Sequence, residues 1–171
     1  MLEKPLENRP IRILMVCLGN ICRSPTAEAM LRHLAVQQAP RLKLKIDSAG
    51  TADYHIGAPP DPRSQLAALR RGIDISGLRA RQVTAHDFTR FDLILAMDRA
   101  NLRALESLKP VGANAQLKLF MDYAPGTGVL EVPDPYYGDA AGFDVVLDLC
   151  AAASRGLLAS LESAQQPIKA P

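Results

Sequence analysis

The sequence predicts a single α/β domain built on a four-stranded parallel sheet with helices on both faces. Short apolar runs without polar alternation are typical of strands that are buried on both faces, and IRILMVC (11–17) and FDLILAMD (91–98) are two such runs. Segments rich in helix-forming residues lie between the apolar runs, so strand and helix patterns alternate along the chain. The length of 171 residues fits one domain.

The first half of the chain predicts a strand–helix–strand unit followed by another helix. After the strand at 11–17, SPTAEAMLRHLAVQQ (24–38) predicts a helix with apolar residues on one face. LKLKIDSAG (42–50) alternates and then stops at glycine, which predicts a second strand joined to the first by the helix. PPDPRSQLAALRRGI (59–73) begins with turn residues and continues as a helix that ends at Gly72.

The second half begins with the buried strand at 91–98. Asp98 can cap the helix that follows, RANLRALESLK (99–109), which ends before a proline. AQLKLFMDY (115–123) predicts the fourth strand of the sheet.

The remaining segments predict the limits of the domain. Residues 124–140 contain prolines and glycines and predict a long loop, whereas AGFDVVLDLCAAASRGLLASLESA (141–164) predicts a long helix. The sequence therefore predicts a folded domain over 11–164, an N-terminal extension over 1–10 and a C-terminal tail over 165–171.

The composition excludes several classes of function. A net charge of +2 argues against a protein that works through a nucleic-acid or membrane field, and no apolar run reaches the length of about 20 residues that a membrane span needs. The N-terminal MLEKPLENRP lacks an apolar signal core, which predicts a cytoplasmic protein, although secretion without a signal peptide stays open. Three cysteines do not form a secreted disulfide framework, and His33, His55 and His86 have no metal spacing. We expect no metal and no cofactor.

The segment VCLGNICRSPTAEAM (16–30) places the pattern C-x5-R-S between a predicted strand and a predicted helix. In open α/β sheets, ligands bind at the carboxyl ends of strands, near helix N-termini. Gly19 is expected to allow backbone angles that turn successive N–H groups inward, and Asn20 tolerates left-handed geometry and can brace the loop. The planar guanidinium of Arg23 fits two phosphate oxygens. This phosphate-binding loop after the first strand therefore predicts a site for a phosphate-like oxyanion.

Cys17 is the candidate nucleophile of this loop. A thiol at a helix N-terminus beside a cation ionises readily, and a thiolate under a bound phosphoryl group can attack phosphorus. Ser24 can donate a hydrogen bond to the sulfur and help it leave. The alternative is an inert cysteine buried at a strand end, but the strand before the loop, the glycine within it and the helix after it favour the catalytic interpretation. The chain has neither GKS, GKT nor GxGxxG, so nucleotide-binding loops are excluded.

The segment EVPDPYYGD (131–139) offers a general acid. A route through a phosphocysteine needs a proton for the departing oxygen, and Asp134 lies between two prolines that stiffen the segment. Tyr136 and Tyr137 follow it and can stack on an aromatic substrate. Taken alone, the segment reads as a turn with structural tyrosines, and the requirement for an acid partner favours the catalytic interpretation.

Together these motifs resemble the low-molecular-weight protein tyrosine phosphatases. VCLGNICRSPTAE is similar to the phosphate-binding loop of that family and DPYY to its acid loop, and the resemblance covers about residues 11–160. Other matching segments follow in the family's order: DSAG (47–50), DPR (61–63), GI…ARQ (72–82), FDLILAMD (91–98) and NLR (101–103). The resemblance implies hydrolysis of phosphotyrosine in proteins, and of small aryl phosphates, in two steps. Cys17 attacks phosphorus, Arg23 clamps the oxygens, and Asp134 protonates the tyrosine oxygen and then activates water.

The same resemblance implies the rest of the site. The residues expected to bind phosphate or brace its loop are Leu18, Gly19, Asn20, Ile21, Cys22, Ser24 and Ser48. Those expected to line the substrate cleft are Leu18, Tyr54, Tyr136 and Tyr137. Cys22 is implied as a redox partner that forms a disulfide with Cys17 under oxidation; the alternative is that it packs as a small apolar residue. The implied partners are a phosphotyrosine-containing protein and, as inhibitors, phosphate or vanadate.

One position departs from the family, and two rival functions stay open. Family members often carry a histidine where this chain has Arg71, and that histidine helps to brace the loop asparagine. Arg71 is either a disturbance of that network or a solvated cation at a helix end.

An arsenate reductase on the same fold needs further cysteines, but Cys150 is the only cysteine after the loop and its apolar pattern predicts a core position. A non-catalytic phosphotyrosine-binding module would need neither Cys17 nor Asp134.

Overall fold

The computed structural model describes residues 9–166. The elements are β1 (Ile11–Cys17), α1 (Arg23–Gln38), β2 (Leu44–Gly50), α2 (Pro62–Leu69), α3 (Asp87–Arg90), β3 (Leu93–Ala96), α4 (Arg99–Leu108), β4 (Gln116–Leu119) and α5 (Ala141–Gln165). Most of the predicted extension (1–10) and tail (165–171) lies outside the described residues, so these domain limits stay predictions.

The four strands form one parallel sheet, as predicted, and their order is β2-β1-β3-β4. Met15 in the middle of β1 pairs with Ser48 on one side and with Leu95 on the other. The chain moves from β1 to one side for β2 and then crosses to the other side for β3. The carboxyl ends of β1 and β3 therefore form the switch point at which such sheets bind their ligands.

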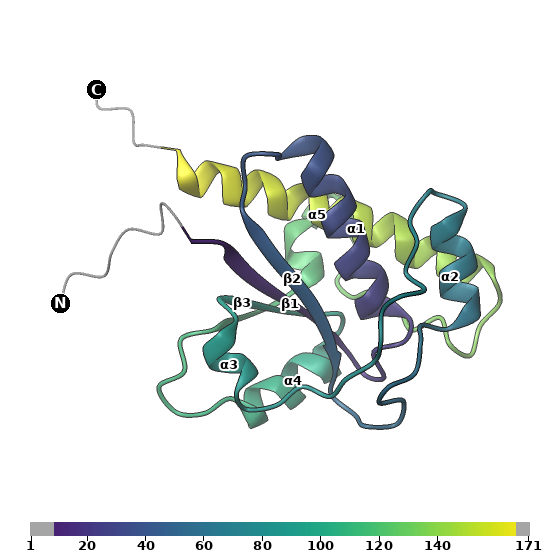
Figure 1. Cartoon of the computed structure of the whole chain (residues 1–171), viewed down its shortest axis with the longest axis horizontal. Coiled ribbons are helices and arrows are strands. Elements are labelled where there is room, and N and C mark those ends of the chain that lie inside the picture. Colours follow the sequence, from purple (N-terminus) through teal and green to yellow (C-terminus); the bar gives the residue numbers. More distant parts are fainter. Residues whose placement is uncertain (1–8, 167–171) are drawn as a thin grey trace.

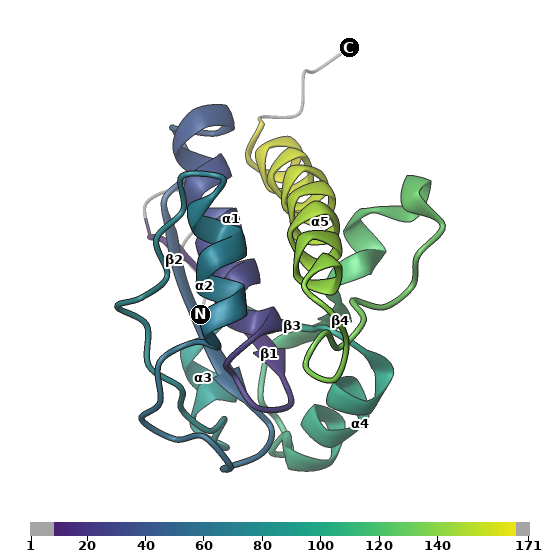
Figure 2. The same cartoon turned by 90° about the vertical axis from the view of Figure 1, so that its right-hand side faces the viewer.

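Alternating side chains of β1 supply two hydrophobic layers, one on each face of the sheet. Ile13 and Met15 join the layer under α1, α2 and α5. Leu14 and Val16 face the opposite layer, which α3 and α4 cover. Figures 1 and 2 show the same division, with α1, α2 and α5 on one side of the sheet and α3 and α4 on the other. The prediction of helices on both faces is confirmed, and Cys17 belongs to the α1 side.

Several predicted elements are shorter than expected, among them the strand predicted over 91–98, which occupies Leu93–Ala96, and one helix was missed. The strand predicted over 115–123 ends at Leu119, and a 3-10 helix continues over Phe120–Tyr123. Phe120 and Met121 are neighbours and both pack into the layer on the α1 side, whereas neighbouring strand residues point to opposite faces. The helix predicted over 59–73 occupies Pro62–Leu69, and Gly72 lies beyond it at φ 77°. The single helical turn α3 lacked a sequence pattern long enough to predict it.

The start of α4 follows the prediction closely. The Asp98 side chain accepts a hydrogen bond from the backbone N–H of Asn101 at 2.8 Å, and the Asn101 side chain accepts one from the N–H of Asp98 at 3.2 Å. This reciprocal capping box fixes the carboxylate of Asp98 just beyond the end of β3.

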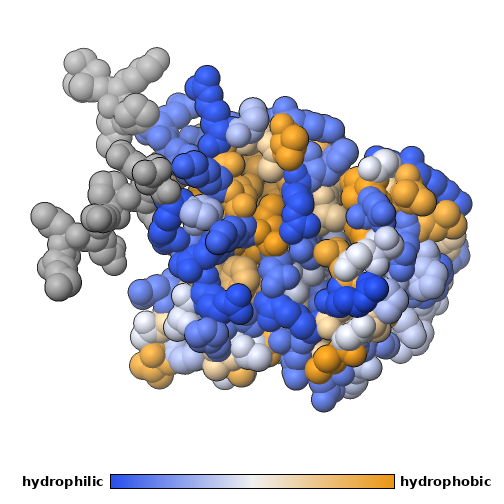
Figure 3. All heavy atoms as spheres, viewed as in Figure 1, coloured by the Kyte–Doolittle hydropathy of each residue, from blue (hydrophilic) through white to orange (hydrophobic). Residues whose placement is uncertain are grey.

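An apolar hollow lies on the face that carries α1 and β2. Figure 3 shows apolar residues gathered in the middle of this face, with hydrophilic residues around them. The hollow is lined by the end of α1, the following turn and β2 up to Ile46. It therefore lies away from the carboxyl ends of the strands. Within residues 9–166, no helix combines the length and apolarity needed to cross a membrane.

Cys150 lies on the inner side of α5 and is completely buried, as predicted for a core residue. Burial raises the pKa of its thiol from an ordinary 9.0 to about 12. The folded protein therefore holds this proton where the unfolded chain releases it. The resulting contribution to stability is present below pH 9 and is lost as the pH rises towards 12.

We expect Cys150→Ala to lower the melting temperature at pH 7, because the smaller side chain leaves a cavity. Above pH 9 the wild-type protein loses the contribution of the buried thiol, so the difference in melting temperature between the two proteins shrinks. Thermal unfolding of both proteins from pH 7 to pH 11 measures this. A difference that stays constant over the whole range would contradict the expectation.

Candidate functional site

The loop after β1 surrounds the Cys17 sulfur with polar groups. The backbone N–H of Asn20 donates to Sγ at 3.3 Å, and the hydroxyl of Ser24 lies 3.1 Å from it. Cys17 itself is only 3% exposed. The loop is held to β2 because the N–H of Thr51 donates to the carbonyl of Cys17 at 2.9 Å. The sulfur thus lies at the base of a braced turn whose next residues begin α1.

The left-handed residue of this loop is Asn20, as expected, with φ 56°. Gly19 was expected to supply the unusual backbone angles, and this was wrong, because the described loop has no positive φ at that position. A side chain at Gly19 would instead meet the ring of His55, with a Cβ 3.0 Å from its Cδ2. The His55 ring lies directly against the loop and would have to shift by a few tenths of an ångström to admit a side chain at position 19.

The side-chain amide of Asn20 begins a chain of buried hydrogen bonds. Its Nδ2 donates to the hydroxyl of Ser24 at 2.8 Å and to that of Ser48 at 3.0 Å. The Ser48 hydroxyl donates to the carboxylate of Glu28 at 2.7 Å. Burial raises the pKa of Glu28, while hydrogen bonds from Ser48 and Arg32 act in the opposite direction. Sequence analysis missed the part of Glu28 in this chain of hydrogen bonds. The signal that could have shown it is a carboxylate among the apolar residues of the inner face of α1.

The loop asparagine is braced by Arg81. The backbone N–H of Arg81 donates to Oδ1 of Asn20 at 3.0 Å. The side chain of Arg81 is clamped between Asp47 and Asp87, with N–O distances of 2.9 and 3.0 Å. Burial acts to lower the pKa of Arg81, but these two carboxylates raise it above its ordinary value. Arg81 therefore holds its backbone at a fixed place beside the loop.

Arg71 does not take part in this bracing. Its guanidinium pairs with Asp148 at 2.9 Å and with Asp144 at 3.8 Å, both on α5. Of the two interpretations of Arg71, the structure favours a cation near a helix end. Its charge is partly solvated, as expected, but it is also paired with carboxylates of α5. Among the described residues, no hydrogen bond joins Arg71 to Asn20, and the effect of the change from histidine on the loop stays a prediction.

Arg23 is buried and lies between two acids. Its Nη1 donates to Oδ2 of Asp98 at 2.6 Å and to the carbonyl of Val132 at 3.1 Å, and its Nη2 lies 3.5 Å from Oδ2 of Asp134. Burial acts to lower the pKa of Arg23, but Cys17, Asp98 and Asp134 raise it above its ordinary value. The guanidinium stays charged and oriented. Asp98 was predicted only as a helix cap, although its place after β3 could have shown that it meets the loop after β1.

The segment around Asp134 forms one wall beside the loop. The N–H of Tyr136 donates to Oδ1 of Asp134 at 3.1 Å, which leaves the second carboxylate oxygen on the side of Arg23. The rings of Tyr54, His55, Tyr136 and Tyr137 follow one another, with neighbouring centroids 6.4, 6.4 and 4.9 Å apart. The structure thus brings the predicted cleft tyrosines together and adds His55, which had no spacing signal in the sequence. Leu18 is 43% exposed on the phosphate loop.

Cys22 is buried among apolar residues of the α1 layer. Burial raises the pKa of its thiol to about 12. At neutral pH this thiol is therefore protonated and packs as a small apolar group. Its predicted redox partnership with Cys17 stays a prediction.

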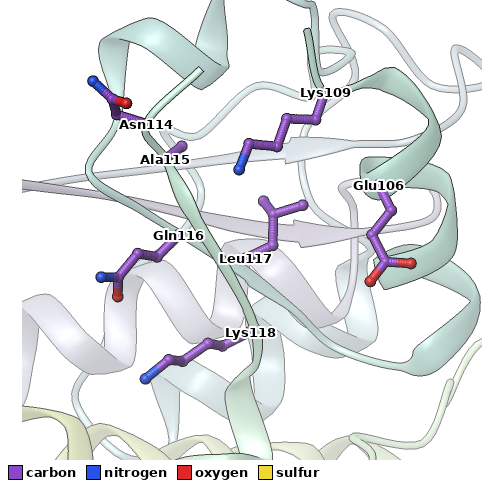
Figure 4. A pocket seen from close by; sticks show the side chains of 7 residues that line it. All are labelled: Glu106, Lys109, Asn114, Ala115, Gln116, Leu117 and Lys118. Carbon is purple, nitrogen blue, oxygen red and sulfur yellow. The ribbon is translucent and has the colours of Figure 1, made fainter. Parts of the chain in front are cut away.

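A second hollow lies far from these groups. It is formed by the end of α4 and by residues 114–118, which lead into β4 and make up most of it, with Glu106, Lys109, Asn114 and Leu117 among its lining residues. In Figure 4, Lys109 and Leu117 extend into the space between the helix and the strand, whereas Gln116 and Lys118 lie on the other side of the strand. Because it is at the amino end of β4, it is separate from the carboxyl-end site.

Comparison with known proteins agrees with this site. The family model described as low molecular weight phosphotyrosine protein phosphatase matches residues 12–167. The chain belongs to this family. Its members are hydrolases that depend on a cysteine, and the protein-tyrosine-phosphatase activity class predicted from the loop and acid motifs is confirmed.

Individual relatives match this phosphatase over nearly its whole length. The low molecular weight protein-tyrosine-phosphatase YfkJ of Bacillus subtilis is 42% identical over 91% of this chain and 99% of its own. The human low molecular weight phosphotyrosine protein phosphatase is 43% identical over 85% of this chain and 92% of its own. A crystal structure of a protein tyrosine phosphatase from Entamoeba histolytica, with Hepes in its active site, has a TM-score of 0.86 at 36% identity, and the match covers 91% of this chain and 99% of that one.

Proposed function

We propose that this phosphatase hydrolyses phosphotyrosine in proteins, and small aryl phosphates, through a phosphocysteine on Cys17. The observation that carries the proposal is the convergence of three groups at the ends of β1 and β3. Cys17 ends β1, Arg23 begins α1, and the Arg23 guanidinium lies 3.5 Å from the carboxylate of Asp134. A nucleophile, an anion clamp and an acid at one point are what phosphoryl transfer to sulfur requires.

In the first step, the Cys17 thiolate attacks phosphorus and an S–P bond forms. The bond between phosphorus and the tyrosine oxygen breaks, and Asp134 gives its proton to that oxygen, so tyrosine leaves neutral. Arg23 holds two of the phosphoryl oxygens in its fork while charge develops on them. The aromatic row from Tyr54 to Tyr137 flanks the substrate ring.

In the second step, the carboxylate of Asp134 takes a proton from a water molecule and the water oxygen attacks phosphorus. The S–P bond breaks, inorganic phosphate is released, and the sulfur returns as a thiolate. The Ser24 hydroxyl, 3.1 Å from Sγ, donates a hydrogen bond to the returning charge. Asn20 keeps this hydroxyl in place, because its side-chain amide donates a hydrogen bond to the Ser24 oxygen at 2.8 Å. Phosphate and vanadate are expected to inhibit by occupying the same cradle.

The position of Cys150 argues against the rival arsenate reductase. Such an enzyme passes a disulfide from the nucleophile to further cysteines. Among residues 9–166 the other cysteines are Cys22 and Cys150, and burial raises the pKa of the Cys150 thiol to about 12. A fully buried, protonated thiol is a poor partner for thiol exchange. The chain therefore offers no built relay beyond the loop.

Asp134→Ala tests the assigned acid. We expect kcat/KM for phosphotyrosine to fall by roughly 10²–10⁴-fold, because the leaving phenolate no longer receives a proton. The loss for p-nitrophenyl phosphate is smaller, because its leaving group is stable as an anion. Steady-state rates with both substrates, measured with and without excess chelator, give the result. The chelator arm checks the expectation that no metal is needed.

Asp139→Ala is the matched control, because it removes a carboxylate of the same loop, whereas the carboxylate of this loop that pairs with Arg23 in the described structure is that of Asp134. It should leave both substrates unchanged. Equal losses on the two substrates in the Asp134 variant would mean that Asp134 does not act as the acid.

A further inference from the structure

Arg63 joins two parts of the chain that lie far apart in the sequence. It belongs to the first turn of α2, and its Nη2 donates to the carboxylate of Asp61 at 2.9 Å. The same nitrogen donates to the backbone carbonyl of Tyr136 at 3.0 Å. Tyr136 lies two residues after Asp134, so this bond reaches the acid segment directly.

The plane of Arg63 is also held by aromatic rings. Its guanidinium carbon lies 4.7 Å from the ring centroid of Phe143 and 5.6 Å from that of Tyr136. Phe143 is buried at the start of α5. Stacking and the fork of donors together fix both the position and the orientation of the guanidinium, which a lysine ammonium could not reproduce.

The other end of this connection is the phosphate-binding loop. The backbone N–H of Asp61 donates to the carbonyl of Ile21 at 2.8 Å, and the Asp61 side chain caps α2 through the N–H of Arg63. A continuous set of contacts therefore runs from Ile21 through Asp61 and Arg63 to Tyr136. Each link is a hydrogen bond or a bidentate ion pair.

The acid segment, residues 133–139, makes few other polar contacts with the rest of the protein. Among the described residues, the contacts of 133–139 with charged side chains elsewhere are those of Asp134 with Arg23 and of the Tyr136 carbonyl with Arg63. A phosphoryl group bound in the Arg23 fork competes with the first of these. Arg63 then remains as the charged group that holds the segment beside the phosphate loop.

We propose that Arg63 is a positioning residue that fixes the acid segment against the phosphate loop and so sets the reach of the Asp134 carboxyl to the leaving oxygen. The proposal rests on the function proposed above, since it takes Asp134 as the acid. Arg63 contacts neither the Cys17 sulfur nor the Asp134 carboxylate within the described residues, so it acts through the backbone of Tyr136. Its effect should follow the leaving group of the substrate.

The test compares Arg63→Ala and Arg63→Lys with wild type on a series of aryl phosphates, from p-nitrophenyl phosphate to phosphotyrosine. We expect kcat/KM for phosphotyrosine to fall by about tenfold to a hundredfold in both variants, the loss typical of a misplaced catalytic group. For p-nitrophenyl phosphate we expect a loss below about threefold, since this substrate needs little help from the acid. Arg70→Ala, at the end of α2, is the matched control and should change neither value.

A double mutant separates positioning from general damage. In the Asp134→Ala background, Arg63→Ala should cause no further loss on phosphotyrosine, because the group that it positions is gone. Additive losses would overturn the proposal, and so would full rescue by Arg63→Lys or equal losses on all substrates. Melting temperatures identify a variant that fails to fold, in which case Arg63→Lys carries the test. If Asp134→Ala itself showed no dependence on the leaving group, the proposed function would fail first and separately.

Discussion

Replacing Cys17 with serine is expected to abolish turnover of phosphotyrosine and of p-nitrophenyl phosphate while the loop still binds its anion. A serine hydroxyl at this position has no neighbouring base to activate it, and the loss of a covalent nucleophile costs about 10⁴-fold or more in kcat. The cradle itself is made by backbone N–H groups and by Arg23, which the substitution leaves in place. Steady-state kinetics and calorimetric titration with vanadate measure the two properties independently.

Cys150→Ala serves as the control for this experiment. It removes a different buried thiol, on the inner side of α5, which is not a hydrogen-bond partner of the Cys17 sulfur among the described residues, and it should keep its turnover at a temperature below its unfolding transition. Full turnover by Cys17→Ser would exclude the phosphocysteine. Loss of anion binding together with loss of turnover would show that the substitution had damaged the loop and would leave the nucleophile to be tested by trapping the phosphoenzyme.

The parts of the site that are local in sequence were predictable, because the same few neighbouring residues supply the reactive groups and determine the backbone conformation of the loop. The loop from Cys17 to Ser24 combines the end of a buried strand, a residue that accepts left-handed angles and the start of a helix. The parallel sheet follows from the alternation of apolar runs and helices, and its strand order places the loop at the switch point.

The remaining parts depend on contacts between distant segments, which periodicity does not encode. Asn20 is braced by the backbone of Arg81, 61 residues further along the chain. A backbone donor has no pattern in the sequence, whereas Arg71, the position that the family resemblance singles out, pairs with α5 instead. His55 packs tightly against Gly19 of the loop, a contact between segments 36 residues apart in the sequence. The end of β4 was misplaced for the same reason, since α5 buries both Phe120 and Met121.

Arg23→Ala is expected to lower kcat/KM by roughly 10³-fold and to remove measurable binding of vanadate. A buried arginine that stabilises a transferring phosphoryl group contributes an effect of about 10³–10⁵-fold in related phosphoryl transfers. Arg23 is only 3% exposed and is oriented by Asp98 at 2.6 Å. Arg23→Lys should recover little, because a single ammonium cannot contact two phosphoryl oxygens in one plane. Kinetics and vanadate titration of both variants test this.

Asp98→Asn separates the orientation of Arg23 from its charge. Asparagine still offers an oxygen to the N–H of Asn101, so α4 keeps its cap. The other carboxylate oxygen, which accepts from Arg23, is replaced by an amide NH2 that cannot accept a hydrogen bond, so the guanidinium gains freedom to turn away from the phosphoryl oxygens. We therefore expect a loss in kcat/KM that lies between wild type and Arg23→Ala, together with a lower melting temperature, because a buried guanidinium loses a charged partner. A retained activity in Arg23→Lys, within about tenfold of wild type, would show that charge alone suffices and that the fork geometry is not required.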